Sequence, residues 1–132
     1  MQTYAFRLPP GQDLKAELDA FAVQHQLEAA CVLACVGSLT RAVLRFANQS
    51  QAATLDGHFE IVSLTGTLSH HGSHVHIAIA DGQGRTYGAH LLEGSRVYTT
   101  AEVVIGELPG LRFGRAPDPA TGYSELDIQP LP

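Results

Sequence analysis

The sequence contains few cations. Lys15 is its single lysine, the arginines are scattered along the chain, and the net charge is −5. A protein that binds nucleic acid needs clustered cations, which neutralise phosphates and release their counterions. Because no such cluster is visible, the sequence disfavours direct binding to nucleic acid.

Long apolar runs and a leader are also missing. No stretch of about 18 apolar residues occurs, and that is the shortest run that crosses a bilayer as a helix. The first residues lack the basic and apolar regions of a secretory signal. We therefore expect a cytoplasmic protein.

Cysteine is scarce, with Cys31 and Cys35 as the only two. They lie in a run of small and β-branched residues that predicts a buried strand over residues 30–36. Residues four apart on a strand share a face and lie about 13 Å apart, whereas a disulfide needs Cα atoms within about 7 Å. We interpret both residues as buried free thiols of a reducing compartment.

The chain does have the composition of a globular protein. Hydrophobic residues make up 45% of its 132 residues and charged residues 16%, which predicts one domain spanning residues 1–132. One amphipathic helix is indicated, because Leu14, Leu18, Phe21 and His25 recur at helical spacing. Asp13 stands at its start as a candidate N-cap.

The remaining pattern is that of strands. Alternating or continuous apolar segments are separated by turn residues, with a turn expected at Gly37-Ser38 and another over residues 118–122. This pattern predicts an α+β fold with one main helix and a mostly antiparallel sheet of about seven or eight strands. The predicted strands cover residues 4–8, 30–36, 40–46, 58–68, 74–80, 85–92 and 97–108. Residues 111–113 and 126–128 are predicted as a closing pair around the turn at residues 118–122.

Four segments, in order, resemble one known family. Residues 36–45 resemble its GS(V/L)xxxxLR motif, residues 57–66 its GRFEILSLxG stretch, and residues 74–91 its bacterial pattern HxHhxhxDxxGxxxGGHL. Residues 113–126 resemble its closing FxRxxDPxTGxxxL. On these motifs the chain is identified as a member of the PPC (plant and prokaryote conserved, DUF296) family, of the bacterial stand-alone type.

The resemblance implies a homotrimer built around a shared sheet surface. It also implies a loose link to DNA, because plant members carry this domain after an AT-hook that binds the DNA. Two positions depart from the family pattern. His58 stands where the family often has arginine, which puts any function of that arginine in doubt, and Ala89 replaces a glycine.

Histidine is the chemically informative residue type, with seven in the chain. His74 and His76 lie two apart on a predicted strand, so both project from one face at about 6.5–7 Å. Together with His90 on the next strand they predict a three-histidine site for zinc or another divalent transition metal. The alternative is a set of half-buried strand histidines bonded to neighbours. We interpret His25 as a core or boundary residue of the helix, and His70 and His71 as solvated turn residues.

The metal hypothesis depends on the register of one hairpin. A loop of two or four residues after the strand 74–80 would turn His90 away from His76. A three-residue loop, Gly82-Gln83-Gly84, would place His90 directly opposite His76. Asp81 and Gly84 suit that loop, in which a type I turn is closed by a left-handed glycine.

Three functions remain open at this stage. They are a metal-binding trimer with a regulatory or small-ligand role, a DNA-associated accessory protein, and a metal-dependent enzyme acting on a small molecule. An enzyme would need a general base. The acids closest in sequence are Glu60, Asp81, Glu93 and Glu102, of which Asp81 is interpreted as a turn residue and Glu60 as a trimer contact or a partner of a ligand histidine.

Overall fold

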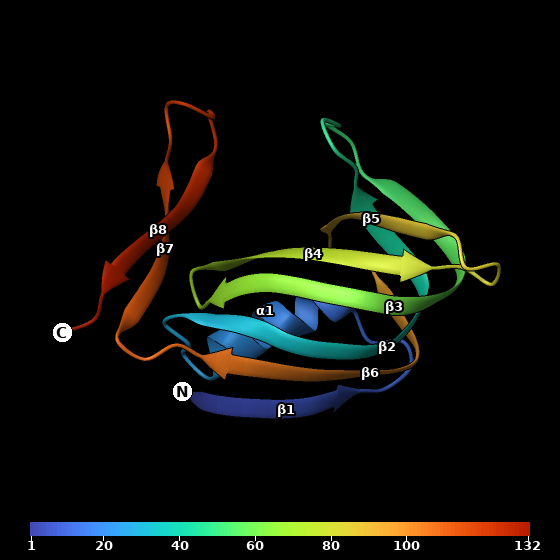
Figure 1. Ribbon diagram of the computed structural model, residues 1–132, viewed down its shortest axis with the longest axis horizontal. Helices are drawn as coiled ribbons and strands as arrows, with labels where there is room; N and C mark the ends of the chain where they lie inside the picture. The colour runs from blue at the N-terminus through green and yellow to red at the C-terminus, as the bar shows by residue number, and fades with distance from the viewer.

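The computed structural model describes all 132 residues and contains one helix and eight strands (Figure 1). A six-stranded antiparallel sheet has the order β1-β6-β2-β3-β4-β5, and β7 and β8 form a separate hairpin. The predicted mostly antiparallel fold with one helix is therefore confirmed. The elements are β1 (Gln2–Leu8), α1 (Leu14–Gln24), β2 (Ala30–Arg45), β3 (Ala53–Ser69), β4 (Gly72–Ala80), β5 (Thr86–Leu91), β6 (Arg96–Glu107), β7 (Leu111–Pro117) and β8 (Ser124–Pro130).

Helix α1 covers one face of the sheet (Figure 1). Asp13 is its N-cap, as predicted: one carboxylate oxygen accepts a hydrogen bond from the Ala16 amide at 3.1 Å, and the other accepts from the Gly94 amide at 2.7 Å. Leu14 and Leu18 are fully buried against the sheet. At about 1.5–3 kcal/mol for each buried leucine side chain, this contact fixes which face of the sheet is the core. No helix of the protein has the length and apolar character needed to cross a membrane.

Strand β2 corrects one prediction, because residues 30–36 and 40–46 belong to a single long strand and Gly37-Ser38 is not a turn. The Gly37-Ser38 pair that suggested a turn has another structural role. A Cβ on Gly37 would overlap the carbonyl oxygen of Thr100 on β6, and the buried Ser38 hydroxyl lies 2.9 Å from that of Thr99. The Gly-Ser pair thus marks a close approach of two strands, with irregular pairing on both sides.

The C-terminal end of β2 also pairs with β5, where Leu44 lies opposite Leu91 and Arg45 opposite His90. This contact joins β2, β3, β4 and β5 into a ring. Side chains inside it, such as Leu39, Ile77 and Ile79, belong to the core, while alternate residues of β4 point to the outer face of the sheet.

The two cysteines lie on different faces, so the prediction that they share a buried face is wrong. The pairing of β2 with β6 is irregular between Val32 and Ala34, and such a bulge reverses the alternation of side chains. Cys35 is in the core, whereas Cys31 is half-buried and lines a hollow on the outer face. Both thiols are free, as predicted.

The β7–β8 hairpin stands at one end of the sheet (Figure 1). Its pairing extends beyond the predicted segments 111–113 and 126–128, from Leu111↔Pro130 to Pro117↔Ser124. Two hydrogen bonds fasten its base: the Phe113 amide donates to the Glu28 carbonyl, and the buried Ser69 hydroxyl donates to the Phe113 carbonyl, both at 2.8 Å.

Candidate metal centre

The turn between β4 and β5 positions the candidate site. The Gly84 amide donates to the Asp81 carbonyl at 2.9 Å, and Gly84 has φ +79°. The Asp81 carboxylate accepts hydrogen bonds from the amides of Gln83 and Arg85, both at 2.9 Å. Asp81 is therefore the predicted turn residue, and the loop is the predicted three-residue loop.

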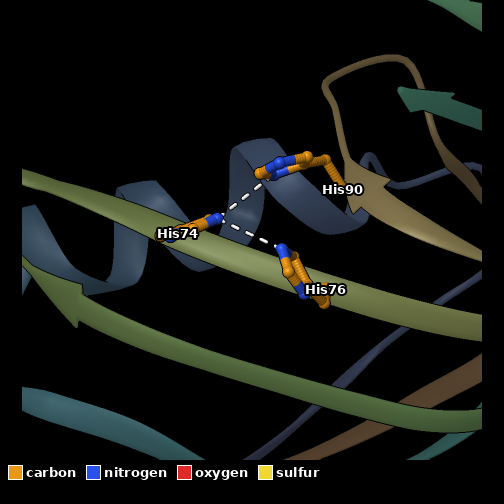
Figure 2. A group of neighbouring side chains, drawn as sticks. All are labelled: His74, His76 and His90. Carbon is orange, nitrogen blue, oxygen red and sulfur yellow. Dashed lines mark hydrogen bonds between the residues drawn. The ribbon is translucent and has the colours of Figure 1, made fainter. Parts of the chain in front are cut away.

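This loop sets the register that the metal hypothesis requires. His90 lies directly opposite His76, and His74 precedes it by two residues on β4. Opposed residues of an antiparallel pair share a face of the sheet. All three imidazoles consequently project from the outer face, away from α1, and converge in Figure 2.

The nitrogen atoms of the triad (His74, His76 and His90) are close together. The Nε2 atom of His74 lies 3.2 Å from Nδ1 of His90 and 3.1 Å from Nε2 of His76. Three nitrogens bound to one ion at about 2.0–2.1 Å in a tetrahedron are separated by about 3.3–3.4 Å. The two observed separations are slightly shorter than this spacing, and all three ligand atoms lie within 4.8 Å of one another.

The electrostatics of the triad favour neutral rings. Burial lowers the pKa of His74, and the positive charges of His76, Arg115 and Arg45 lower it further, against the opposing charge of Glu125. Burial likewise lowers the pKa of His90, with the charges of His76, His74 and Arg45 adding to the effect. Because a metal ligand must offer a free lone pair, these shifts favour the ligating form of two of the rings.

An open hollow of about 400 Å³ lies beside His74 and His76. Its wall includes Thr65 and Thr67, which lie opposite the two histidines on β3, and Cys31, which lies opposite Thr67 on β2. The hollow places two hydroxyls and a thiol next to the triad. Sequence reasoning missed these residues, because their approach depends on the register of three strands.

The four acids expected near the site do not reach it. None of Glu60, Asp81, Glu93 and Glu102 hydrogen-bonds a histidine of the triad. Glu60 lies opposite Ala80, four residues along β4 from His76 and hence about 13 Å away, so it is not a partner of a ligand histidine. The carboxylate whose charge acts on His74 is Glu125 of the hairpin, and no local sequence signal relates the two.

A second cluster of possible ligands joins Glu28, His70 and His71, and we call it the turn cluster. His70 Nε2 lies 3.5 Å from one carboxylate oxygen of Glu28, and Arg112 donates to the other at 3.1 Å. The Arg112 guanidinium, and to a smaller extent His70, lowers the pKa of Glu28. The two histidines expected to be solvated in a turn are thus in the turn between β3 and β4, but His70 also contacts a carboxylate.

The last two histidines serve packing. The ring of His25 stacks on Phe21 with centroids 4.1 Å apart at the end of α1. His25 is exposed, so of the two predicted settings it has the boundary one and not the core. The ring of His58 lies 4.5 Å from that of Tyr98 on the outer face. At position 58, where the family often has arginine, the histidine therefore makes an aromatic contact.

Comparison with known proteins agrees with this fold and these motifs. The model of the Plants and Prokaryotes Conserved (PCC) domain matches residues 1–109. A solved structure of a PPC protein from Pyrococcus horikoshii superimposes with a TM-score of 0.82 at 27% identity, covering 99% of this chain and 94% of that one. The chain belongs to the PPC family, as the sequence motifs predicted.

Individual relatives extend the comparison. A hypothetical protein from Salmonella cholerae-suis has a TM-score of 0.95 and 47% identity, with 98% of this chain and 94% of that chain covered. A protein from Archaeoglobus fulgidus that is described as metal-containing has a TM-score of 0.80 and 26% identity, with 96% and 94% covered.

Curated relatives are longer than this chain. The bifunctional protein GlmU of Synechococcus sp. strain JA-3-3Ab is 51% identical over 129 residues, which is 98% of this chain and 21% of that protein. The chain therefore spans about a fifth of the length of the curated relatives it matches.

Proposed function

We propose that the chain is a metal-binding PPC-domain protein in which His74, His76 and His90 hold one zinc or other divalent transition-metal ion, and that its role is regulation or the binding of a small ligand. The observation that carries this proposal is the 3.1 and 3.2 Å separation of the triad nitrogens. The metal-containing relative from Archaeoglobus fulgidus supports it.

The donor set is suited to such an ion. Three imidazoles without a carboxylate favour zinc, copper, nickel or iron over magnesium and calcium, which prefer oxygen ligands. Three protein ligands leave one tetrahedral position for an exogenous ligand. When bound, the ion supplies a Lewis acid at the outer face of the sheet, and the three histidines orient it.

Elemental analysis of purified, untagged protein tests the proposal. We expect about one transition-metal ion per chain, and loss of that ion in His76→Ala. The matched control is His58→Ala, which removes another histidine from the same face. The proposal fails if the metal content of His76→Ala equals that of the unchanged protein.

A homotrimer is the assembly that this proposal includes. The outer face of the single chain exposes large apolar side chains: Val36 is 63% exposed, Val62 59% and Tyr98 43%. One helix cannot cover both faces of the sheet, so these residues favour a partner. Light scattering at micromolar concentration should give three times the chain mass of 14.1 kDa, and a monodisperse monomer would contradict it.

Association with DNA is the alternative that two putative DNA-binding relatives raise, but at 22% identity each shares only the fold. The charge of this chain, −5, opposes binding to a polyanion. A titration of duplex DNA at moderate salt should show weak or no binding. Submicromolar binding with a steep dependence on salt would favour the alternative.

A metal-dependent enzyme is the third possibility, and the hollow beside the triad favours it over a bare structural ion. The hydroxyls of Thr65 and Thr67 line that hollow, yet no carboxylate hydrogen-bonds a triad histidine. A general base would have to reach a substrate or water molecule in the hollow, and no carboxylate lines it.

A further inference from the structure

Arg45 is a positively charged residue beside one side of the triad. It ends β2 and lies directly opposite His90, where β2 closes the ring with β5. Opposed residues of an antiparallel pair share a face, with Cβ atoms about 4.5–5.5 Å apart. The Arg45 guanidinium is therefore on the outer face beside the triad.

Arg45 has no partner within the protein. Five of the arginines donate hydrogen bonds: Arg7, Arg41, Arg85, Arg96 and Arg112. The two that make neither a hydrogen bond nor an ion pair are Arg45 and Arg115, and both are half-buried. These two also act on the charge of His74. The charges of the two unpaired guanidiniums thus both act on His74, and the strand register places Arg45 beside the triad.

The charges at this place are unbalanced. The triad contains no carboxylate, so a divalent ion held by neutral imidazoles keeps its full charge of about +2. Two guanidiniums add to it, and Glu125 is the one carboxylate whose charge acts on His74. Glu125 is exposed, and the Thr121 hydroxyl donates to it at 3.3 Å. The surroundings of the triad would therefore attract an anion.

We propose that the site binds a small organic carboxylate, with one carboxylate oxygen on the metal ion and the other on the Arg45 guanidinium. A planar guanidinium matches the geometry of a carboxylate. This inference rests on the proposed metal site and names the ligand class of that same site.

The hollow favours an organic acid over inorganic phosphate. It lies on the β3 side of the triad, whereas Arg45 lies on the β5 side. A molecule with its carboxylate at the ion extends its other end into the hollow, between the apolar side chain of Val32 and the hydroxyls of Thr65 and Thr67. Inorganic phosphate would leave those contacts unused.

Cobalt-loaded protein provides the test, because the visible spectrum of Co²⁺ changes when its fourth ligand changes. The protein is titrated with acetate, with succinate and with inorganic phosphate. We expect a saturable spectral change with the carboxylates, tighter for succinate than for acetate, and at least about tenfold weaker carboxylate binding in Arg45→Gln, since a hydrogen bond to a charged group is worth about tenfold or more.

Two variants keep the outcomes distinct. Arg41→Gln removes a guanidinium four residues earlier on β2, one that pairs with Asp56, and it should bind carboxylates like the unchanged protein. Arg45→Lys keeps the charge without the planar fork and should give an intermediate affinity. In all variants cobalt should bind at one ion per chain, which separates this inference from the metal site itself.

The results that overturn the inference are specific. If cobalt binds but no carboxylate changes its spectrum, or if Arg45→Gln and Arg41→Gln bind carboxylates equally, the role of Arg45 is wrong. If phosphate alone responds, the ligand class is wrong. If cobalt itself does not bind to the unchanged protein, the failure belongs to the proposed metal site.

Discussion

The triad and the turn cluster contain similar ligand types, but their lone pairs are engaged differently. In the triad the ring nitrogens face one another at 3.1 and 3.2 Å, and no carboxylate contacts them. In the turn cluster Glu28 is already shared between Arg112 at 3.1 Å and His70 at 3.5 Å. Proximity of ligand atoms therefore does not define a metal site, because an ion at the turn cluster would have to compete with an existing ion pair.

The two clusters also differ in how they are positioned. The register of two neighbouring strands fixes the triad residues, and each strand position has one outward direction. His70 and His71 are adjacent in a two-residue turn, with ring centroids 3.9 Å apart. We expect the triad to be preorganised for metal and the turn cluster to be a local electrostatic contact.

Removing single histidines should give the largest difference between the clusters. Loss of an outer-shell partner already costs about 10–100-fold in metal affinity, so His74→Ala or His90→Ala should weaken zinc binding by at least about 100-fold. His70→Ala and His71→Ala should leave it unchanged. Titration of zinc against a competing chelator measures the affinities, and a loss in the turn variants would reverse the comparison.

A change in the β4–β5 loop should weaken metal binding without touching a ligand. Gly84 has φ +79°, a conformation that costs a side-chain-bearing residue about 1–2 kcal/mol, so Gly84→Val should disturb the register and lower zinc affinity by about tenfold.

Gly122→Val is the matched control for this change. Gly122 has φ +80° and open space around it, as Gly84 does, but it lies in the turn between β7 and β8. Both variants should lose similar stability in thermal unfolding, whereas only Gly84→Val should lose zinc affinity. Equal zinc affinity in the two would show that the loop does not set the register.

Protonation of the two clusters should lower the free energy of unfolding of the protein in different pH ranges. Burial, with the charge of His76, lowers the pKa of His74 below 6.5. Below pH 6.5 the unfolded chain binds a proton that the folded chain does not, so the free energy of unfolding of metal-free protein should fall from pH 6.5 down through the folded pKa.

Glu28 should act in a lower window. The Arg112 guanidinium lowers its pKa below 4.5, so its contribution is complete above pH 4.5 and is lost as the pH falls through the folded pKa. Thermal unfolding between pH 3 and 8 should show that His74→Gln reduces the slope of the upper window, to which His90 also contributes, and that Glu28→Gln flattens the lower window. Identical profiles for the two variants would contradict this separation.

The smallest expected effect is a difference in reactivity between the two thiols, because Cys31 lies on the outer face and Cys35 in the core. Burial raises the pKa of Cys35 to about 11, and the charge of Glu102 adds to the rise. A thiol reagent at pH 8 should therefore modify Cys31 first, since Cys31 lines the hollow beside the triad. Cys31→Ser should remove the fast phase. Equal rates of modification for the two thiols would contradict the difference in their exposure.

Local chemistry made part of the structure predictable from the sequence. Asp81 and Gly84 specify a three-residue loop, and the alternation of β4 then places His76 opposite His90. The N-cap at Asp13 and the one helix follow from equally local signals. These elements need only a few neighbouring residues to define them.

The rest depends on contacts between distant segments. A Gly-Ser pair is the signal of a turn in most sequences, but at Gly37 it allows β6 to approach. One bulge in β2 separates the faces of Cys31 and Cys35. Arg45 reaches His90 through a pairing of strands that are 45 positions apart along the chain. No pattern within a single segment encodes such a pairing.

The closing of β2 onto β5 has a consequence for motion. His90 lies in a strand paired on both sides. The pairing of β4 with β5 ends at His76↔His90, so the first part of β4, with His74, has β3 alone as its neighbour. An ion bound by the triad would join a firmly held part of the sheet to a part that opens more easily. Metal binding should then slow hydrogen exchange at the first residues of β4 and leave the slow exchange of the His90 amide unchanged.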